Sequence, residues 1–243
     1  MFFIDKDFLI FSSHKTGTQT LINTFNQNGY KCGFCHRLIN FKHHKKYIDF
    51  NYNDLKQNFL NVIQKYYTQN NKKIKIISVI RNPLQRLPSS FFQILYNDYI
   101  KFFNYNPDET PIQTENIEKL LKIFYEGLFQ EETPGLIESI DELSDILEVN
   151  IIEECTKKDD HYYFENDLVQ IYILDFKRII DENSLNYLNN ILDINLTLMS
   201  ERNLAKNKPY YEKYIEFKSK IPEDTKEAIS KMYNNFYFTA FEE

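Results

Sequence analysis

The sequence predicts an α/β fold, in which helices flank a central parallel sheet in three layers and a mainly helical C-terminal half follows. Three observations lead to this class. Strand-like and helix-like patterns alternate through the first 80 residues. The run Ile74–Ile80 is rich in β-branched residues, as is typical of a strand buried on both faces of a parallel sheet. The polar segment His14–Thr18 lies where a first strand turns into a first helix, which is the start of a βαβ unit.

The first predicted element is a short buried strand over Asp7–Ser13. Leu21, Ile22 and Phe25 then have the apolar spacing of a helix, and Gly29 ends it. The elements expected next are a strand over 30–36, a helix over 54–67 and the buried strand over 74–80. Together they form two βαβ units.

The remainder of the chain is predicted to be mostly helical. Pro107 and Pro111 mark residues 104–114 as a loop. The acidic residues between 126 and 167 indicate a solvated face. All 243 residues fit one domain, 1–243, with a helical insertion at about 104–165. The expected elements are helices over 83–103, 115–129, 135–148 and 184–192, one or two helices over 210–238, and a strand over 168–176.

Composition excludes several classes of protein. With 42% hydrophobic residues the chain can bury a substantial core, so a disordered protein is excluded. A net charge of -6 argues against nucleic acid or an anionic membrane as the partner, because both require a basic surface. No apolar stretch reaches the length of a membrane span. The three cysteines are too few for a disulfide framework, and the expected compartment is the cytoplasm.

The segment Ser12–Thr20 is a candidate phosphate-binding loop. It lies between the first strand and the first helix, where backbone N–H groups and the helix dipole converge on an anion. Gly17 allows close approach of the backbone, Lys15 adds a positive charge, and Thr16, Thr18 and Thr20 add hydroxyl donors. The segment is not a Walker A loop, because its lysine precedes the glycine. The alternative is an ordinary N-capped turn with a solvated lysine.

A second candidate anion-binding segment begins where the strand over 74–80 ends. Arg81 follows this strand, Pro83 suits the first position of a helix, and Ser89 lies about two turns along that helix. Ligands of open α/β sheets collect at the carboxyl ends of the strands, so both segments point to one binding site. The alternative is a helix-capping arginine and a surface serine.

Together, Lys15-Thr16-Gly17-Thr18 and the set Arg81, Pro83, Arg86 and Ser89 resemble the two nucleotide-binding motifs of the sulfotransferases, most closely the carbohydrate sulfotransferases. The resemblance implies a P-loop-like three-layer sandwich and covers about half of the chain. It implies 3'-phosphoadenosine 5'-phosphosulfate (PAPS) as the sulfonate donor, adenosine 3',5'-bisphosphate as the product, no metal, and a carbohydrate or other hydroxyl acceptor.

The resemblance also assigns roles to individual residues. Lys15 would act on the leaving oxygen, and Arg81 and Ser89 would bind the 3'-phosphate. The residues of the loop that would hold the 5'-phosphate are Lys15, Thr16, Gly17, Thr18, Gln19 and Thr20. Pro88 departs from a regular helix and leaves the position of Ser89 open, with Ser90 as the fallback.

The acceptor hydroxyl requires a general base, and His36 is the first candidate because it ends the predicted second strand and titrates near neutrality. Some carbohydrate sulfotransferases have a catalytic histidine after this strand, and His36 resembles that histidine in position. The alternative for His36 is a partly exposed structural histidine. Further candidates for the base are His14, His43, His44 and an acidic residue from the middle region.

Other signals favour other functions. Cys32-Gly33-Phe34-Cys35-His36 has the CxxCH pattern of covalent haem attachment, and a zinc site could add His43 or His44, but a strand over 30–36 places the two cysteines on opposite faces. A nucleotide kinase would need a magnesium-binding carboxylate after a strand, for which Asp175 is the candidate. A non-catalytic protein that binds adenosine phosphates is the third class.

Overall fold

Two compact units make up the chain, and each is built from two separate stretches. Met1–Ile80 and Ile137–Arg202 form the first unit, and Arg81–Leu136 and Asn203–Glu243 form the second. The computed structural model describes residues 6–13, 15–35, 38, 51–97, 111–128, 138–200 and 207–242. None of the helices within these ranges is both long and apolar enough to cross a membrane.

The first unit is organised around a six-stranded sheet in the order β2-β1-β3-β6-β5-β4. The four strands β2, β1, β3 and β6 are parallel, β5 is antiparallel to β6, and β4 is antiparallel to β5. The α/β class predicted from the sequence is therefore confirmed, but the sheet is mixed rather than wholly parallel. The strands span Phe8–Phe11 (β1), Cys32–Cys35 (β2), Ile74–Ile80 (β3), Thr156–Lys157 (β4), His161–Glu165 (β5) and Val169–Asp175 (β6).

The central strands are buried because their side chains are apolar on both faces. All four residues of β1 are buried, and in β3 the side chain of Ile77 is completely inaccessible. Ile77 is paired with Ile10 of β1 on one side and with Tyr172 of β6 on the other. Continuous apolar runs of this kind require cover on both faces of the sheet.

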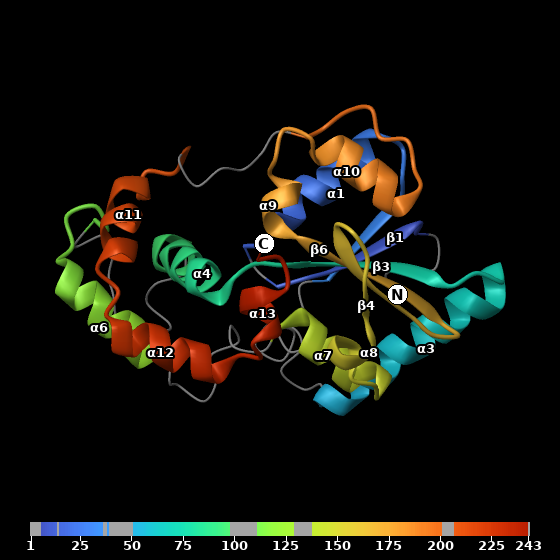
Figure 1. Ribbon diagram of the computed structural model, residues 1–243, viewed down its shortest axis with the longest axis horizontal. Coiled ribbons are helices and arrows are strands. Elements are labelled where there is room, and N and C mark those ends of the chain that lie inside the picture. The colour runs from blue at the N-terminus through green and yellow to red at the C-terminus, as the bar shows by residue number, and fades with distance from the viewer. Residues whose placement is uncertain are drawn as a thin grey trace. The chain divides into compact units, whose positions relative to one another are not determined.

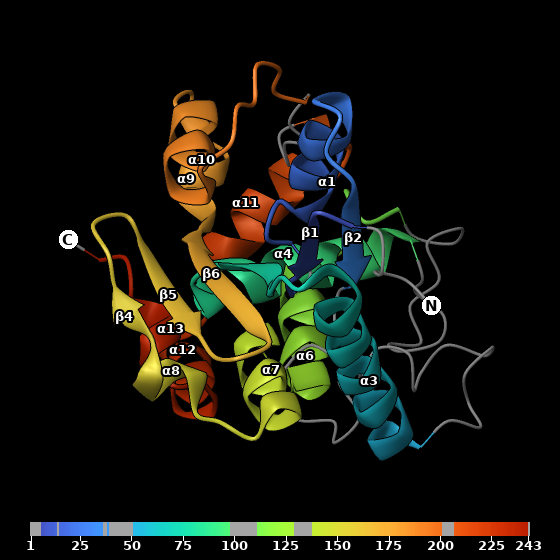
Figure 2. The ribbon, with the colours of Figure 1, turned by 90° about the vertical axis from the view of Figure 1, so that its right-hand side faces the viewer.

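Helices of the first unit cover both faces (Figures 1 and 2). On one face α1 (Thr18–Gln27), α9 (Phe176–Ile179) and α10 (Ser184–Leu192) form a core with the sheet that includes Phe25, Tyr172 and Leu188. On the other face lie α3 (Tyr52–Asn70) and α7 (Ser139–Leu147), followed by α8 (Ile151–Glu154). There the rings of Phe11 and Phe59 are 5.5 Å apart.

The second unit contains helices only, within the described residues. Its core is aromatic: the ring of Phe217 lies 5.4 Å from Phe91, 5.1 Å from Phe92 and 5.4 Å from Phe124. Such ring pairs add stability beyond the burial of their area. The helices are α4 (Pro83–Asn97), α6 (Ile117–Leu128), α11 (Tyr211–Ser219), α12 (Glu223–Met232) and α13 (Phe236–Thr239).

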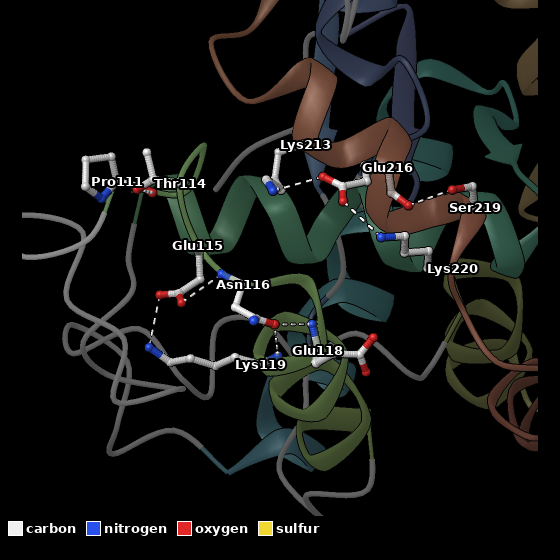
Figure 3. A network of polar contacts seen from close by, with 10 residues as sticks. All are labelled: Pro111, Thr114, Glu115, Asn116, Glu118, Lys119, Lys213, Glu216, Ser219 and Lys220. Atoms are coloured by element: carbon white, nitrogen blue, oxygen red, sulfur yellow. Dashed lines mark hydrogen bonds and ion pairs between the residues drawn. The ribbon is translucent and has the colours of Figure 1, made fainter.

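Local polar contacts support two helices of the second unit, α6 and α11 (Figure 3). Asn116 caps α6, since its Oδ1 accepts the backbone N–H of Glu118 at 2.7 Å. In α11 the carboxylate of Glu216 is paired with Lys213 at 2.9 Å and with Lys220 at 3.1 Å. These spacings are those of neighbouring side chains on a helix surface.

Within the described residues, the second half of the chain contains more helix than strand, as expected, and it also supplies β4, β5 and β6. One expectation for this half requires correction, because the acidic region between 126 and 167 is not a uniformly solvated face. Glu138 and Glu142 are 1% and 2% exposed. Both carboxylates accept hydrogen bonds from groups distant in the sequence, which charge patterning alone does not reveal.

Candidate functional site

The candidate phosphate loop lies at the carboxyl ends of the parallel strands, where a ligand site is expected. β1, β3 and β6 are parallel, so their carboxyl ends lie at one edge of the sheet. The loop after β1 leads into α1, and Asp175 leads directly into α9 at the same edge. Gly17 lies close to α9, because a Cβ at this position would be 3.3 Å from Cγ2 of Ile179. Ligands of open α/β sheets bind at this edge.

The backbone of the loop is arranged so that N–H groups remain for an anion. Lys15 has φ 65° and Gly17 has φ 74°, both in the left-handed region. Gly17 is the N-cap of α1, and among the described residues no side chain caps this helix. The first intrahelical bond runs from the N–H of Leu21 to the carbonyl of Gly17 at 3.1 Å. The preceding N–H groups of the first turn have no partner within the helix and suit an anion.

The threonine side chains of the loop are buried, and the hydroxyl of Thr16 is used within the loop itself. The hydroxyl of Thr16 is fully buried and donates to the carbonyl of Ser13 at 2.7 Å. Thr18 and Thr20 are buried as well, at 4% and 5% exposure. The hydroxyl of Thr16 thus holds the loop together instead of adding a donor for the ligand. The side chain of Gln19 is exposed and donates to Oδ1 of Asn23 at 2.8 Å.

Ser12 joins the carboxyl ends of β1 and β3. Its Oγ accepts the N–H of Val79 at 3.1 Å and donates to the carbonyl of Val79 at 2.9 Å. The same Oγ lies 2.7 Å from Oγ1 of Thr16. Because these groups are buried, each lost partner would cost the desolvation of a polar group. The serine therefore fixes the position at which the loop begins.

Two glycines with similar backbone angles allow the packing of the loop to be tested. Gly17→Ala is expected to lower the free energy of unfolding by about 1 kcal/mol for the left-handed backbone, plus the cost of the contact with Ile179. Gly29→Ala, at φ 82° and with nothing within 4 Å, is expected to show the backbone cost alone. Urea unfolding of both variants measures the difference, and equal losses would contradict close packing at Gly17.

Arg81 follows β3 directly along the chain and belongs to the second unit. Its half-buried side chain is hydrogen-bonded to Tyr214 of α11. Burial, and then the positive charge of Arg86, lower the pKa of the Arg81 guanidinium. A guanidinium nevertheless stays protonated in proteins. An anion bound here would offset both effects.

The helix α4 continues through Pro88 without interruption. Proline removes only its own N–H from the helical ladder, so one hydrogen bond is lost. Ser89 therefore keeps its helical position, where it is 5% exposed, and Ser90 is half-buried. Arg86 of the same helix is fully buried and donates from Nη2 to the hydroxyl of Tyr233 at 3.3 Å.

Of the five histidines, only His161 lies within the described residues. The candidate bases His36, His14, His43 and His44 lie outside the described residues. His161, which the sequence analysis did not consider, pairs with Leu174 and so lies at the carboxyl end of β6. Its ring is 6.1 Å from that of Tyr172, and burial lowers the pKa of the imidazole. The signal that identifies His161 is strand pairing, which needs the tertiary structure.

The cysteines of the CxxCH pattern lie in β2, as predicted. Along this strand Gly33 and Cys35 are buried whereas Cys32 is half-buried and Phe34 exposed, so the two thiols lie on opposite faces. Burial raises the pKa of the Cys32 thiol to about 12. All three cysteines are free thiols. Among the described residues, no three His, Cys, Asp or Glu side chains are grouped to hold a metal.

The sequence did not reveal the buried hydrogen bonds of four serines. Ser12, Ser13, Ser78 and Ser139 are all completely inaccessible, and each makes a buried hydrogen bond between segments far apart in the sequence. A buried serine has no distinctive sequence signal. The carboxylate of Glu138 belongs to the same group of contacts, through Ser13.

Comparison with known proteins gives no match: no protein-family model, no curated protein and no solved structure is similar to this chain. The functional assignment therefore depends on the residues of this chain and on the geometry of their surroundings.

Proposed function

We propose that this protein is a PAPS-dependent sulfotransferase with a P-loop-like fold, which sulfates a hydroxyl of a carbohydrate. The observation that carries the proposal is the loop after β1. Lys15 and Gly17 are in left-handed conformations, and the first turn of α1 has no side-chain cap among the described residues. Such a loop suits a doubly anionic group next to the ammonium group of Lys15.

The reaction assigned to this protein is an in-line transfer of a sulfonate group. The acceptor oxygen forms a bond to sulfur while the bond from sulfur to the bridging oxygen of PAPS breaks. The products are a sulfate ester and adenosine 3',5'-bisphosphate, and the proton of the acceptor passes to a general base. Lys15 stabilises the charge that develops on the bridging oxygen, and positioning provides the remainder of the rate acceleration.

The 3'-phosphate is assigned to Arg81 and Ser89. Arg81 has the charge and the planar donors that suit a phosphate, and its half-buried position strengthens a charge-assisted hydrogen bond. The buried hydroxyl of Ser89 would donate a second bond. The backbone N–H groups of Thr16, Gly17, Thr18, Gln19 and Thr20 are assigned to the 5'-phosphosulfate.

Incubation of the full chain with labelled PAPS or labelled ATP separates this proposal from its alternatives. Transfer of label from PAPS to glycans on an array is the expected result. Transfer from ATP would indicate the kinase instead, and tight binding of adenosine 3',5'-bisphosphate without turnover would indicate a binding protein. Asp175, the candidate magnesium ligand of a kinase, caps α9 through Oδ1, and burial raises the pKa of its carboxyl group.

The general base is expected to show in the pH dependence of turnover. A histidine accepts a proton only when neutral, so activity should fall as the pH drops through its pKa. We keep His36 as the first candidate. Its replacement by alanine should abolish most of the turnover and remove the acidic limb, whereas His161→Ala should keep both. If His161 is the base instead, the limb lies below the ordinary pKa of histidine, because burial lowers the pKa of His161.

A further inference from the structure

A buried carboxylate lies next to the candidate phosphate loop. Oε2 of Glu138 accepts a hydrogen bond from Oγ of Ser13 at 2.7 Å, and Glu138 is 1% exposed. Oγ of Ser13 also accepts the backbone N–H of Ser139 at 3.1 Å. Ser139 in turn is hydrogen-bonded to Ser78 of β3 at 2.8 Å. These contacts join the end of β1, the end of β3 and the start of α7.

A carboxylate at this position needs an explanation. Burying an ionised group costs several kcal/mol unless it is hydrogen-bonded or paired. At Glu138 the negative charge also lies close to a loop that is assigned to a polyanion. A neutral side chain would fill the space without this repulsion. The hydrogen bond to Ser13 is the contact through which this charge acts on the loop.

The loop requires a firm anchor. The left-handed conformation of Lys15 is unfavourable for a residue with a Cβ and persists only where the surroundings determine it. Ser13 precedes Lys15 by two positions. The distance between Oγ of Ser13 and the carboxylate is that of a strong, charge-assisted hydrogen bond. Such a bond holds the start of the loop more firmly than a neutral acceptor would.

We propose that Glu138 is a positioning residue, whose carboxylate holds Ser13 and thereby fixes Lys15 and the N–H groups of the first turn of α1 in their anion-binding arrangement. The identity of the ligand rests on the proposed function, but the effect of Glu138 on the loop does not. The two can therefore be tested separately.

The test measures hydrogen exchange of the backbone amides at 15–20 in the full chain without ligand. Glu138→Ala is expected to accelerate exchange there by about 10-fold or more, since a hydrogen bond to a charged group is lost. Ser13→Ala should have a similar effect, and the double variant should add little to either. Glu138→Gln keeps an acceptor oxygen but loses the charge, so it should restore only part of the protection. This variant also keeps the test valid if Glu138→Ala does not fold.

Glu142 is the matched control. It is equally buried, lies one turn further along α7, and accepts the backbone N–H of Leu38 at 2.9 Å. Glu142→Ala should lower the thermal stability by a similar amount without selective exchange at 15–20. If both alanine variants affect the loop equally, or if Glu138→Ala leaves it protected, the proposal is overturned.

Calorimetry with adenosine 3',5'-bisphosphate completes the experiment. Weaker binding by Glu138→Ala, with partial rescue by Glu138→Gln, would support the positioning role. If the unaltered protein does not bind this nucleotide but Glu138→Ala still loosens the loop, the positioning role stands and the proposed function fails. If Glu138→Gln has a protected loop but loses turnover together with the acidic limb of the pH profile, Glu138 is the general base and the positioning assignment is wrong.

Discussion

Replacing Lys15 by alanine is expected to lower the turnover of PAPS by about 10²-fold or more, while the affinity for PAPS changes much less. The ammonium group acts chiefly where charge develops on the leaving oxygen, so its loss affects the transition state more than the bound substrate. Alanine keeps the Cβ and therefore the left-handed backbone strain of Lys15. The measurement is steady-state kinetics together with calorimetric titration of the bisphosphate product.

Two further variants control for the fold and for the overall charge. Lys15→Gly also removes the amine, but it should unfold at a higher temperature than Lys15→Ala because glycine has no Cβ to strain at this φ. Its turnover should be equally low. Lys31→Ala removes a positive charge just before β2, at the amino ends of the parallel strands and so away from the loop. This variant should retain turnover. Near-normal turnover of Lys15→Ala would show that Lys15 is not catalytic.

Replacing Arg81 by alanine is expected to weaken binding of adenosine 3',5'-bisphosphate by roughly 10- to 100-fold, which corresponds to the loss of a charge-assisted hydrogen bond. Binding of adenosine 5'-phosphosulfate should be almost unchanged, because this nucleotide has no 3'-phosphate. Calorimetric titration with the two ligands measures the difference. The reason is local: the half-buried guanidinium of Arg81 is held by Tyr214 and lies near the positive charge of Arg86.

Neighbouring residues provide the controls for Arg81. Tyr214→Phe removes the hydroxyl that holds the guanidinium but leaves its charge, so the loss of affinity should be smaller and again confined to the bisphosphate. Arg86→Ala should chiefly lower the thermal stability, because this side chain is completely buried. Equal weakening of both nucleotides by Arg81→Ala would mean that Arg81 has a structural role.

Elements such as β3 and α10 were predictable because their sequence signal is local. A strand over 74–80 and a helix over 184–192 were expected, and β3 and α10 have these bounds. The hairpin of β4 and β5 was missed. Its residues alternate only weakly between apolar and polar. β5 is a strand because it pairs with β6 from His161 to Glu165. Pairing energy of this kind is not visible in a short window.

The sequence by itself determined the α/β class, the order of its main elements, and the position of the two candidate anion-binding segments after β1 and β3. These properties follow from periodicity and from turn chemistry, which are local. The tertiary structure decided how the hydroxyl of Thr16 is used, that Ser89 keeps its place on an unbroken α4, and that Glu138 is bonded to Ser13 across 125 positions of sequence. Each of these depends on which buried groups meet, because a polar group without water must find its partner wherever the fold places one.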